Sequence, residues 1–209
     1  MMLIKPTQSN IKGAILAGGK ATRMGGAVKG MLPDENGQSI IQHLMNEMRL
    51  AGVHDVVIAV NDPGPYMNLG VKTVSDLREG FGPIAGMEAV LLHYADQCDG
   101  VLFVPCDMPN ITAEEFIALK KAFIHSVAGI VFAETGDFFW HPLCAVVHND
   151  MVTQITSAID RDQRKVQDLW KQLDAKSVKF TEEAAFINMN SFSDVNSWRG
   201  NTHEKKTLC

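Results

Sequence analysis

The chain has 209 residues, and its 46% hydrophobic and 21% charged residues are ordinary for a globular domain with one sizeable core. No apolar stretch approaches the ~20 residues that a membrane span needs, and the start MMLIKPTQSN lacks the apolar core of a signal peptide. The formal net charge of −5 argues against general binding to nucleic acids, which usually requires a basic excess. We expect a cytoplasmic protein that binds neither membranes nor nucleic acids.

The cysteines Cys98, Cys106, Cys144 and Cys209 are scattered and form no CxxC pair. This spacing argues against a disulfide framework and against a zinc site, and it suits a reducing compartment. The last eleven residues, RGNTHEKKTLC, have little apolar content. We therefore expect a single domain over residues 1–198 and a flexible tail over 199–209.

The first half of the chain alternates apolar runs with helical patterns. Strands are predicted at IKGAILAG (11–18), DVVIAVND (55–62) and VKTVSD (71–76). A helix is predicted over 39–52, capped by Ser39 and ended by Gly52. After the Gly/Pro-rich EGFGPIAG, a second helix is expected around Met87 to Tyr94.

The second half continues the alternation. DGVLFVPCD (99–107) predicts a buried strand, and TAEEFIALKKAFIH (112–125) predicts a helix with a capping box of Thr112 and Glu115. GIVFAE (129–134) and HPLCAVV (141–147) predict two strands that could be antiparallel. The rest predicts a helix over 151–173, short strands at SVKFT and AFINMN, and a last helix from SDVNSW.

This order predicts an α/β fold of three layers, α/β/α, with a mostly parallel sheet and right-handed crossovers. Ligands of such sheets bind beyond the carboxyl ends of the strands. Four stretches fall at predicted strand ends: LAGGKATRMGG, SDLREGFGPIAG, PCDMP and NMN. Gly, Pro and Asp gather in any loop, which explains one or two such stretches. Four together indicate a ligand site.

The loop LAGGKATRMGGAVKG (16–30) is unusually rich in glycine and basic residues. It fits neither the dinucleotide fingerprint GxGxxG nor the phosphate loop GxxxxGK[ST]. Consecutive glycine amides can still cradle an anion, Arg23 offers a planar fork for phosphate oxygens, and Lys29 offers a compact charge. From the residues alone, a phosphate-binding loop and a flexible glycine hairpin stay equally open.

This loop, together with GPIAG, PCDMP and FINMN, resembles the molybdenum cofactor guanylyltransferases, which belong to the GT-A-like nucleotidyltransferases. The resemblance runs from about Lys12 to about Trp198. It implies a Rossmann-like nucleotidyltransferase fold and an enzyme that transfers GMP from GTP to the terminal phosphate of molybdenum-bearing molybdopterin, with release of pyrophosphate. It also implies Mg²⁺, with Mn²⁺ as a substitute, and transient contact with molybdoenzymes or other proteins of molybdenum cofactor biosynthesis.

The resemblance also implies residue roles. Nucleotide contacts fall on Leu16, Ala17, Gly18, Gly19, Gly26, Lys29, Asp76, Pro83 and Asp107. Of the loop residues, Gly19, Arg23, Gly25 and Gly26 would wrap the triphosphate. The catalytic set is Arg23, Lys29 and Asp107: Lys29 would neutralise charge on the α-phosphate and the pyrophosphate, and Asp107 would hold the metal.

Each of these residues also has a simpler interpretation. Lys29 alone could be a solvated surface lysine, Asp107 could cap a turn before Pro109, and the GPIAG stretch could be a turn and helix cap. Asp76 could accept from N1 and N2 of guanine or from a ribose hydroxyl, and the sequence does not choose.

On the acceptor side, the resemblance points to His141, Asn188 and Asn190. On a strand, the two asparagines would share one face. They could also be strand-end turn formers, and His141 could be structural. Some family members carry an asparagine where this chain has Ala59, two residues before Asn61, so a guanine contact by that strand stays open.

Two alternatives remain beside guanylyl transfer. The chain could be a related nucleotidyltransferase with another donor or acceptor, such as CTP with molybdopterin, or a sugar phosphate. It could also be a non-catalytic protein that delivers the cofactor. The glycine loop with its cations and Asp107 favour an enzyme.

Overall fold

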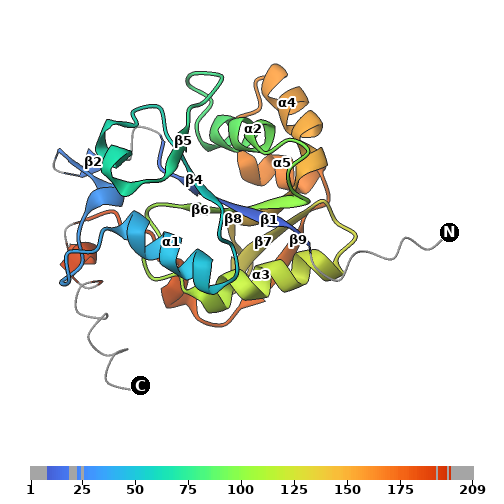
Figure 1. The fold of residues 1–209 in the computed structure, drawn as a ribbon. Coiled ribbons are helices and arrows are strands. Elements are labelled where there is room, and N and C mark those ends of the chain that lie inside the picture. The colour runs from blue at the N-terminus through green and yellow to red at the C-terminus, as the bar shows by residue number, and fades with distance from the viewer. Residues whose placement is uncertain (1–8, 19–22, 25, 192, 197, 199–209) are drawn as a thin grey trace.

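A computed structural model describes residues 9–18, 23–24, 26–191, 193–196 and 198. Seven strands form one sheet in the order β5-β4-β1-β6-β8-β7-β9 (Figure 1). Their bounds are β1 Ile11–Leu16, β4 Val56–Ala59, β5 Lys72–Val74, β6 Gly100–Pro105, β7 Ile130–Thr135, β8 Phe139–His148 and β9 Lys176–Phe180. A separate hairpin joins β2 (Arg23–Met24) to β3 (Ala27–Val28).

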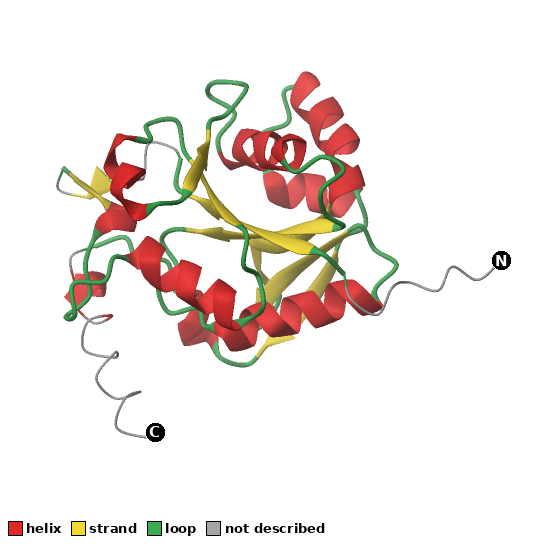
Figure 2. Ribbon diagram, viewed as in Figure 1, coloured by secondary structure: helices red, strands yellow, loops and turns green. Residues whose placement is uncertain are grey.

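Helices cover both faces of the sheet (Figure 2). α1 (Ile40–Leu50) and α3 (Ala113–His125) pack on one face, and α2 (Pro83–His93), α4 (Val152–Asp160) and α5 (Val166–Gln172) pack on the other. Each face has its own apolar cluster, because the parallel strands are buried on both sides. The predicted three-layer α/β/α architecture is confirmed. Within the described residues, no helix is both long and apolar enough to cross a membrane.

The direction of one strand matters for the site. β1 pairs in parallel with β4 and β6, and β4 with β5, whereas β8 runs antiparallel to both β6 and β7. The amino end of β8 therefore lies at the same edge of the sheet as the carboxyl ends of β1, β4, β5 and β6. The predicted antiparallel pair is confirmed, and it brings a fifth segment to the edge where ligands are expected.

Local sequence signals place two of the helices as expected. Ser39 accepts from the amide of Gln42 at the start of α1, and the Gln42 side chain accepts from Ser39 in return. Thr112 and Glu115 form the same reciprocal cap on α3. Such caps contribute about 1 kcal/mol each because they satisfy backbone amides that the first helical turn leaves unpaired.

Two predicted helices differ from the structure. α2 begins at Pro83 and not near Met87: Gly82 takes φ +70°, and Pro83, whose φ is fixed for a helix, occupies the first position. The single helix expected over 151–173 is two, because α4 ends at Asp160 and Asp162 adopts φ +60° before α5 begins.

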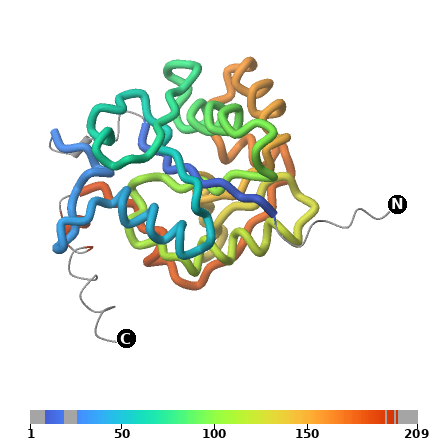
Figure 3. Tube along the Cα trace, viewed as in Figure 1, coloured from blue at the N-terminus to red at the C-terminus, as the bar shows by residue number. Residues whose placement is uncertain are grey.

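The predicted strand at AFINMN is also wrong. A 3₁₀ helix, η5 (Glu183–Phe186), occupies its start, and the backbone then runs across the edge of the sheet without joining it. The amide of Met189 donates to the carbonyl of Asp107 at 2.7 Å and pairs with no strand. Figure 3 shows this late segment beside the early segment that follows β1. The predicted tail, 199–209, lies outside the described residues.

Candidate nucleotide-binding site

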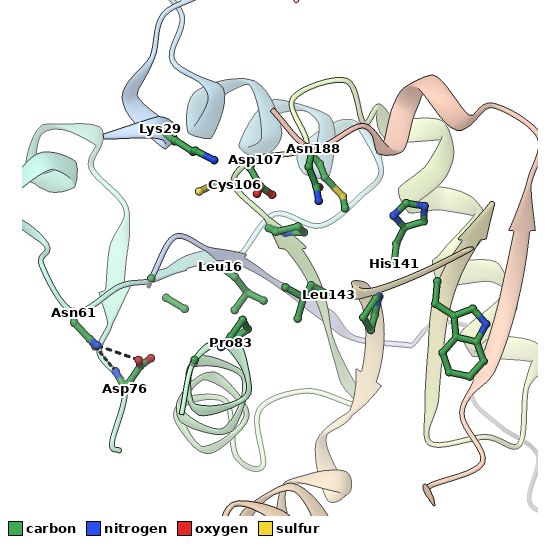
Figure 4. A pocket seen from close by; sticks show the side chains of 18 of the residues that line it. Leu16, Lys29, Asn61, Asp76, Pro83, Cys106, Asp107, His141, Leu143 and Asn188 are labelled. Atoms are coloured by element: carbon green, nitrogen blue, oxygen red, sulfur yellow. Dashed lines mark hydrogen bonds between the residues drawn. The ribbon is translucent and has the colours of Figure 1, made fainter. Parts of the chain in front are cut away.

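A cavity of about 750 Å³ opens at the carboxyl edge of the sheet. Each of the four stretches singled out in the sequence contributes to it, and so does the amino end of β8 (Figure 4). Its lining includes Leu16, Gly18, Lys29, Ala59, Asn61, Asp76, Pro83, Gly86, Cys106, Asp107, Phe139, Trp140, His141, Leu143 and Asn188. The cavity therefore lies at the strand ends where the sequence predicts a ligand site.

Lys29 lies in a short 3₁₀ helix, η2 (Lys29–Met31), and only 5% of it is exposed. Its ammonium donates to the carbonyl oxygen of Met189 at 3.0 Å and to Oδ1 of Asn190 at 3.1 Å. A buried ammonium needs such partners because burial removes its hydration. These partners exclude the interpretation of Lys29 as a solvated surface lysine.

Asp107 lies two residues beyond the end of β6 and faces the same end of the cavity as Lys29 (Figure 4). Burial raises the pKa of its carboxyl above 3.8, and the positive charge of Lys29 partly opposes that rise. No described side chain donates a hydrogen bond to its carboxylate. A partly buried carboxyl group that receives no hydrogen bond from a described side chain suits a cation better than it suits a turn cap.

The two asparagines of NMN take different positions. Asn188 lines the cavity near Asp107, whereas Asn190 accepts from Lys29 and does not line the cavity. Asp194 accepts from the amides of Asn190 and Ser191 at 2.8 and 2.7 Å, and this turn holds Asn190 in place. The predicted alternation along a strand is corrected, because the segment is tied to Asp107 and Lys29 and not to the sheet.

The opposite end of the cavity, called the slot below, is lined largely by apolar residues. Leu16, Ala59 and Pro83 form its walls, and Gly86 of α2 leaves it open. A Cβ at Gly86 would lie 3.3 Å from Oδ1 of Asp76 and 3.5 Å from Cδ2 of Leu16. Apolar walls with one acidic edge have the chemistry to bind a nucleobase.

Asp76 forms that acidic edge together with Asn61. The amide of Asp76 donates to Oδ1 of Asn61 at 2.8 Å, and Nδ2 of Asn61 donates to Oδ2 of Asp76 at 3.0 Å (Figure 4). Burial raises the pKa of Asp76 above 3.8, and the bond from Asn61 lowers it in part. Asn61 was not among the predicted site residues, although it stands at a predicted strand end, which is the signal that could have found it.

A third side of the cavity is aromatic. His141 is buried, with Nε2 2.9 Å from Oγ1 of Thr135, and its ring stacks on Phe186 with centroids 4.8 Å apart. Burial lowers the pKa of His141 below 6.5, so the ring is neutral at pH 7. Phe139 and Trp140, which sequence reasoning missed, line the same side. They come from the amino end of a strand, whereas the rule used on the sequence considers only the carboxyl ends.

Some predicted residues do not line the cavity. Ala17 is buried, and its amide donates to the carbonyl of Ala59 at 2.9 Å. Gly26 takes φ +88° in the β2–β3 hairpin and also lies off the cavity wall. Gly19, Gly25 and the side chain of Arg23 lie outside the described part of the chain.

The arrangement can hold a divalent cation only with help from a ligand. Across the described residues, no three His, Cys, Asp or Glu side chains gather at one point. Asp107 supplies one carboxylate, and Asn188 lines the cavity near it. Mg²⁺ is usually bound by one or two carboxylates with phosphate oxygens and water completing the shell, so this donor set fits a metal that arrives with a nucleotide.

Comparison with known proteins agrees with this geometry. The model of the MobA-like NTP transferase domain matches residues 13–177. A molybdenum cofactor guanylyltransferase of Yersinia pestis (strain Pestoides F) is 34% identical over 194 residues, which are 91% of this chain and 96% of the relative.

Two solved structures share the fold. Molybdopterin-guanine dinucleotide biosynthesis protein A from Archaeoglobus fulgidus is 21% identical, with a TM-score of 0.74 over 92% of this chain and 99% of its own. Rv0371C from Mycobacterium tuberculosis H37Rv, solved in complex with manganese, is 13% identical, with a TM-score of 0.63 over 91% and 98%. By the family model and the identity to the Yersinia relative, this chain belongs to the MobA-like NTP transferases, among the molybdenum cofactor guanylyltransferases.

Proposed function

We propose that this nucleotidyltransferase transfers GMP from GTP to the terminal phosphate of molybdenum-bearing molybdopterin, forming the guanine dinucleotide cofactor and pyrophosphate. The observation that carries the proposal is one cavity with Lys29 and Asp107 at one end and the Asp76–Asn61 pair at the other. A nucleotide can lie between them, with its base in the apolar slot and its phosphates at the cation.

The chemistry needs no protein nucleophile. An oxygen of the acceptor phosphate attacks the α-phosphorus of GTP, a new P–O bond forms, and the bond to the bridging oxygen of pyrophosphate breaks. Positioning and neutralisation of charge then supply most of the catalysis. Cys106, next to Asp107, fits this view: burial raises the pKa of its thiol to about 12, so no thiolate is present at pH 7.

The residues divide this work by position. Lys29 neutralises charge on the α-phosphate and the leaving pyrophosphate, and the proposal gives Arg23 a supporting role on the triphosphate. Asp107 would hold Mg²⁺, or Mn²⁺ in its place, and the ion would neutralise phosphate charge. Leu16, Ala17, Gly18, Gly19, Gly26, Asp76 and Pro83 keep their proposed nucleotide contacts.

The acceptor would lie on the aromatic side of the cavity. His141 is neutral, buried and stacked, so it can contact a ring system without adding charge. Asn188 stands between that side and Asp107, where it could reach the acceptor phosphate (Figure 4). Asn190 acts on the acceptor only through Lys29. Delivery of the product would require transient contact with molybdoenzymes or other proteins of the same biosynthesis.

Calorimetric titration with GTP, CTP, ATP and UTP, each with Mg²⁺, tests the donor. Binding of GTP alone is the expected result, and pyrophosphate release on addition of molybdopterin would then establish the transfer. Preference for CTP would mean that the chain transfers a cytidylyl group. Turnover with a sugar phosphate would mean that the acceptor is a sugar phosphate and not molybdopterin. GTP binding without pyrophosphate release from any acceptor would favour a protein that only delivers the cofactor.

A further inference from the structure

Asn61 and Asp76 stand at the ends of two neighbouring parallel strands, β4 and β5. The strand ladder ends with the amide of Val60 donating to the carbonyl of Val74 at 2.8 Å. Just beyond this last backbone bond, the side chain of Asn61 forms hydrogen bonds with both the backbone amide and the carboxylate of Asp76. Both ends of one amide group are thus used on one aspartate.

One of these two bonds ties Asn61 to the backbone of Asp76, and the other restrains the Asp76 carboxylate through Oδ2. Oδ2 is held by Asn61, and Oδ1 lies over Gly86, 3.3 Å from the position that a Cβ there would take. No hydrogen bond from a described residue reaches Oδ1. The carboxylate therefore presents an acceptor to the slot in one orientation before any ligand arrives.

The segment that follows Asp76 is held by contacts with α2, α4 and Arg164. Nε of Arg78 lies 3.2 Å from Oε2 of the buried Glu88 on α2, and Arg78 also pairs with Asp160 on α4. The guanidinium of Arg164 donates to the carbonyl of Gly80 at 3.0 Å. These contacts hold the segment that follows Asp76, and Asn61 holds the carboxylate of Asp76 itself.

We propose that Asn61 is a specificity-determining positioning residue, which holds Asp76 so that its carboxylate accepts from two adjacent N–H donors of the base. This inference rests on the proposed function. Among the four common bases, only guanine presents two neighbouring donors, N1–H and N2–H, on one edge. Adenine and cytosine place a ring acceptor there, which a carboxylate repels because it has no proton to donate. A ribose hydroxyl would need no fixed plane.

The test compares GTP, ITP, ATP and 2′-deoxy-GTP, each with Mg²⁺, on the wild-type chain and on Asn61→Ala by calorimetry. ITP lacks only the 2-amino group. In the wild type we expect GTP to bind at least ~10-fold more tightly than ITP, since a hydrogen bond to a charged acceptor is worth about that factor. Asn61→Ala should lower GTP affinity about tenfold and ITP affinity by a smaller factor, because ITP keeps only one of the two donors, N1–H. ATP affinity should stay within about twofold, so the GTP-to-ITP ratio falls.

Asn46→Ala is the matched control. Asn46 is an exposed asparagine on α1 whose Oδ1 accepts from Arg49 at 3.2 Å, away from the cavity. Asn61→Asp is a second variant, which keeps the size of the side chain, removes the donor and places a like charge beside Asp76. It should therefore lower GTP affinity more than Asn61→Ala does. Melting temperatures of all variants verify that they fold.

Three results would overturn the inference. A uniform loss for all nucleotides in Asn61→Ala would show a merely structural role. An unchanged GTP-to-ITP ratio would show that the plane of Asp76 is set without Asn61. A changed GTP-to-2′-deoxy-GTP ratio, with GTP-to-ITP unchanged, would move Asp76 to the ribose. Failure of the wild type to bind GTP would instead overturn the proposed function, and this inference with it.

Discussion

Replacing Lys29 by methionine tests the centre of the proposed mechanism. Methionine fills nearly the same space as the lysine stem but carries no charge and no donor. The change leaves the carbonyl of the buried Met189 and Oδ1 of Asn190 without their bond to the ammonium. It also removes the positive charge that lowers the pKa of Asp107.

The expected magnitudes differ for stability and for catalysis. Asn190 is exposed, so water can replace the lost bond, whereas the Met189 carbonyl loses its partner inside the protein at a cost of about 1–3 kcal/mol. In a chain of this size that cost corresponds to a fall in Tm of roughly 2–12 °C. Loss of charge stabilisation in the transition state should lower kcat by at least ~100-fold, about 2.7 kcal/mol.

The assay measures kcat from pyrophosphate release with GTP and molybdopterin, and Tm on the same samples. Lys120→Met is the matched control, because Lys120 is also a partly buried lysine that donates to a backbone carbonyl, that of Ala51, at 2.6 Å. It lies on α3, away from the cavity, and its loss should lower Tm with little change in kcat.

Similar kcat values for the two lysine variants would refute the assignment. Loss of kcat that follows the loss of Tm in both would mean that Lys29 acts through stability alone. Lys29→Arg should recover part of the activity, since charge is kept while the geometry of the donor changes.

Three further predictions address other parts of the cavity. Gly86→Ala should weaken GTP binding, because its Cβ enters the slot 3.3 Å from Oδ1 of Asp76. The same close contact opposes the gain of about 1 kcal/mol that alanine brings to a helix over glycine, so Tm should change little. Tighter GTP binding in calorimetry would contradict this prediction. Asp107→Asn should abolish turnover and raise Tm at pH 7. Because burial raises the pKa of Asp107 in the folded chain, its ionised form destabilises that chain at a pH above this pKa. The gain in Tm from the substitution should therefore vanish as the pH falls toward 3.8. His141→Gln should raise KM for molybdopterin and leave GTP affinity unchanged. The pH–activity profile of the wild type should show no loss of activity from a charged His141 between pH 7 and 8. An equal effect on both substrates would mean that His141 does not act on the acceptor side.

Much of the fold follows from local signals in the sequence. The apolar runs of β1, β4 and β6 predict a sheet buried on both faces, and the caps at Ser39 and Thr112 mark two helix starts within a residue. Because parallel strands end at one edge, the order of the elements also predicts where a ligand binds. Asp76 and Asp107 stand just after such strand ends, Lys29 lies in the longer segment that follows β1, and all three line the cavity.

Tertiary structure decided what depends on contacts between distant segments. The NMN stretch has the alternation of a strand, but bonds to Lys29 and to the carbonyl of Asp107 draw it across the edge of the sheet. β8 runs against its neighbours, so Phe139 and Trp140 reach the cavity from a strand's beginning. The link from Asn61 to Asp76 spans two strands and a crossover. Local patterns determine which elements form, and the pairing of side chains across them is set only when the chain has folded.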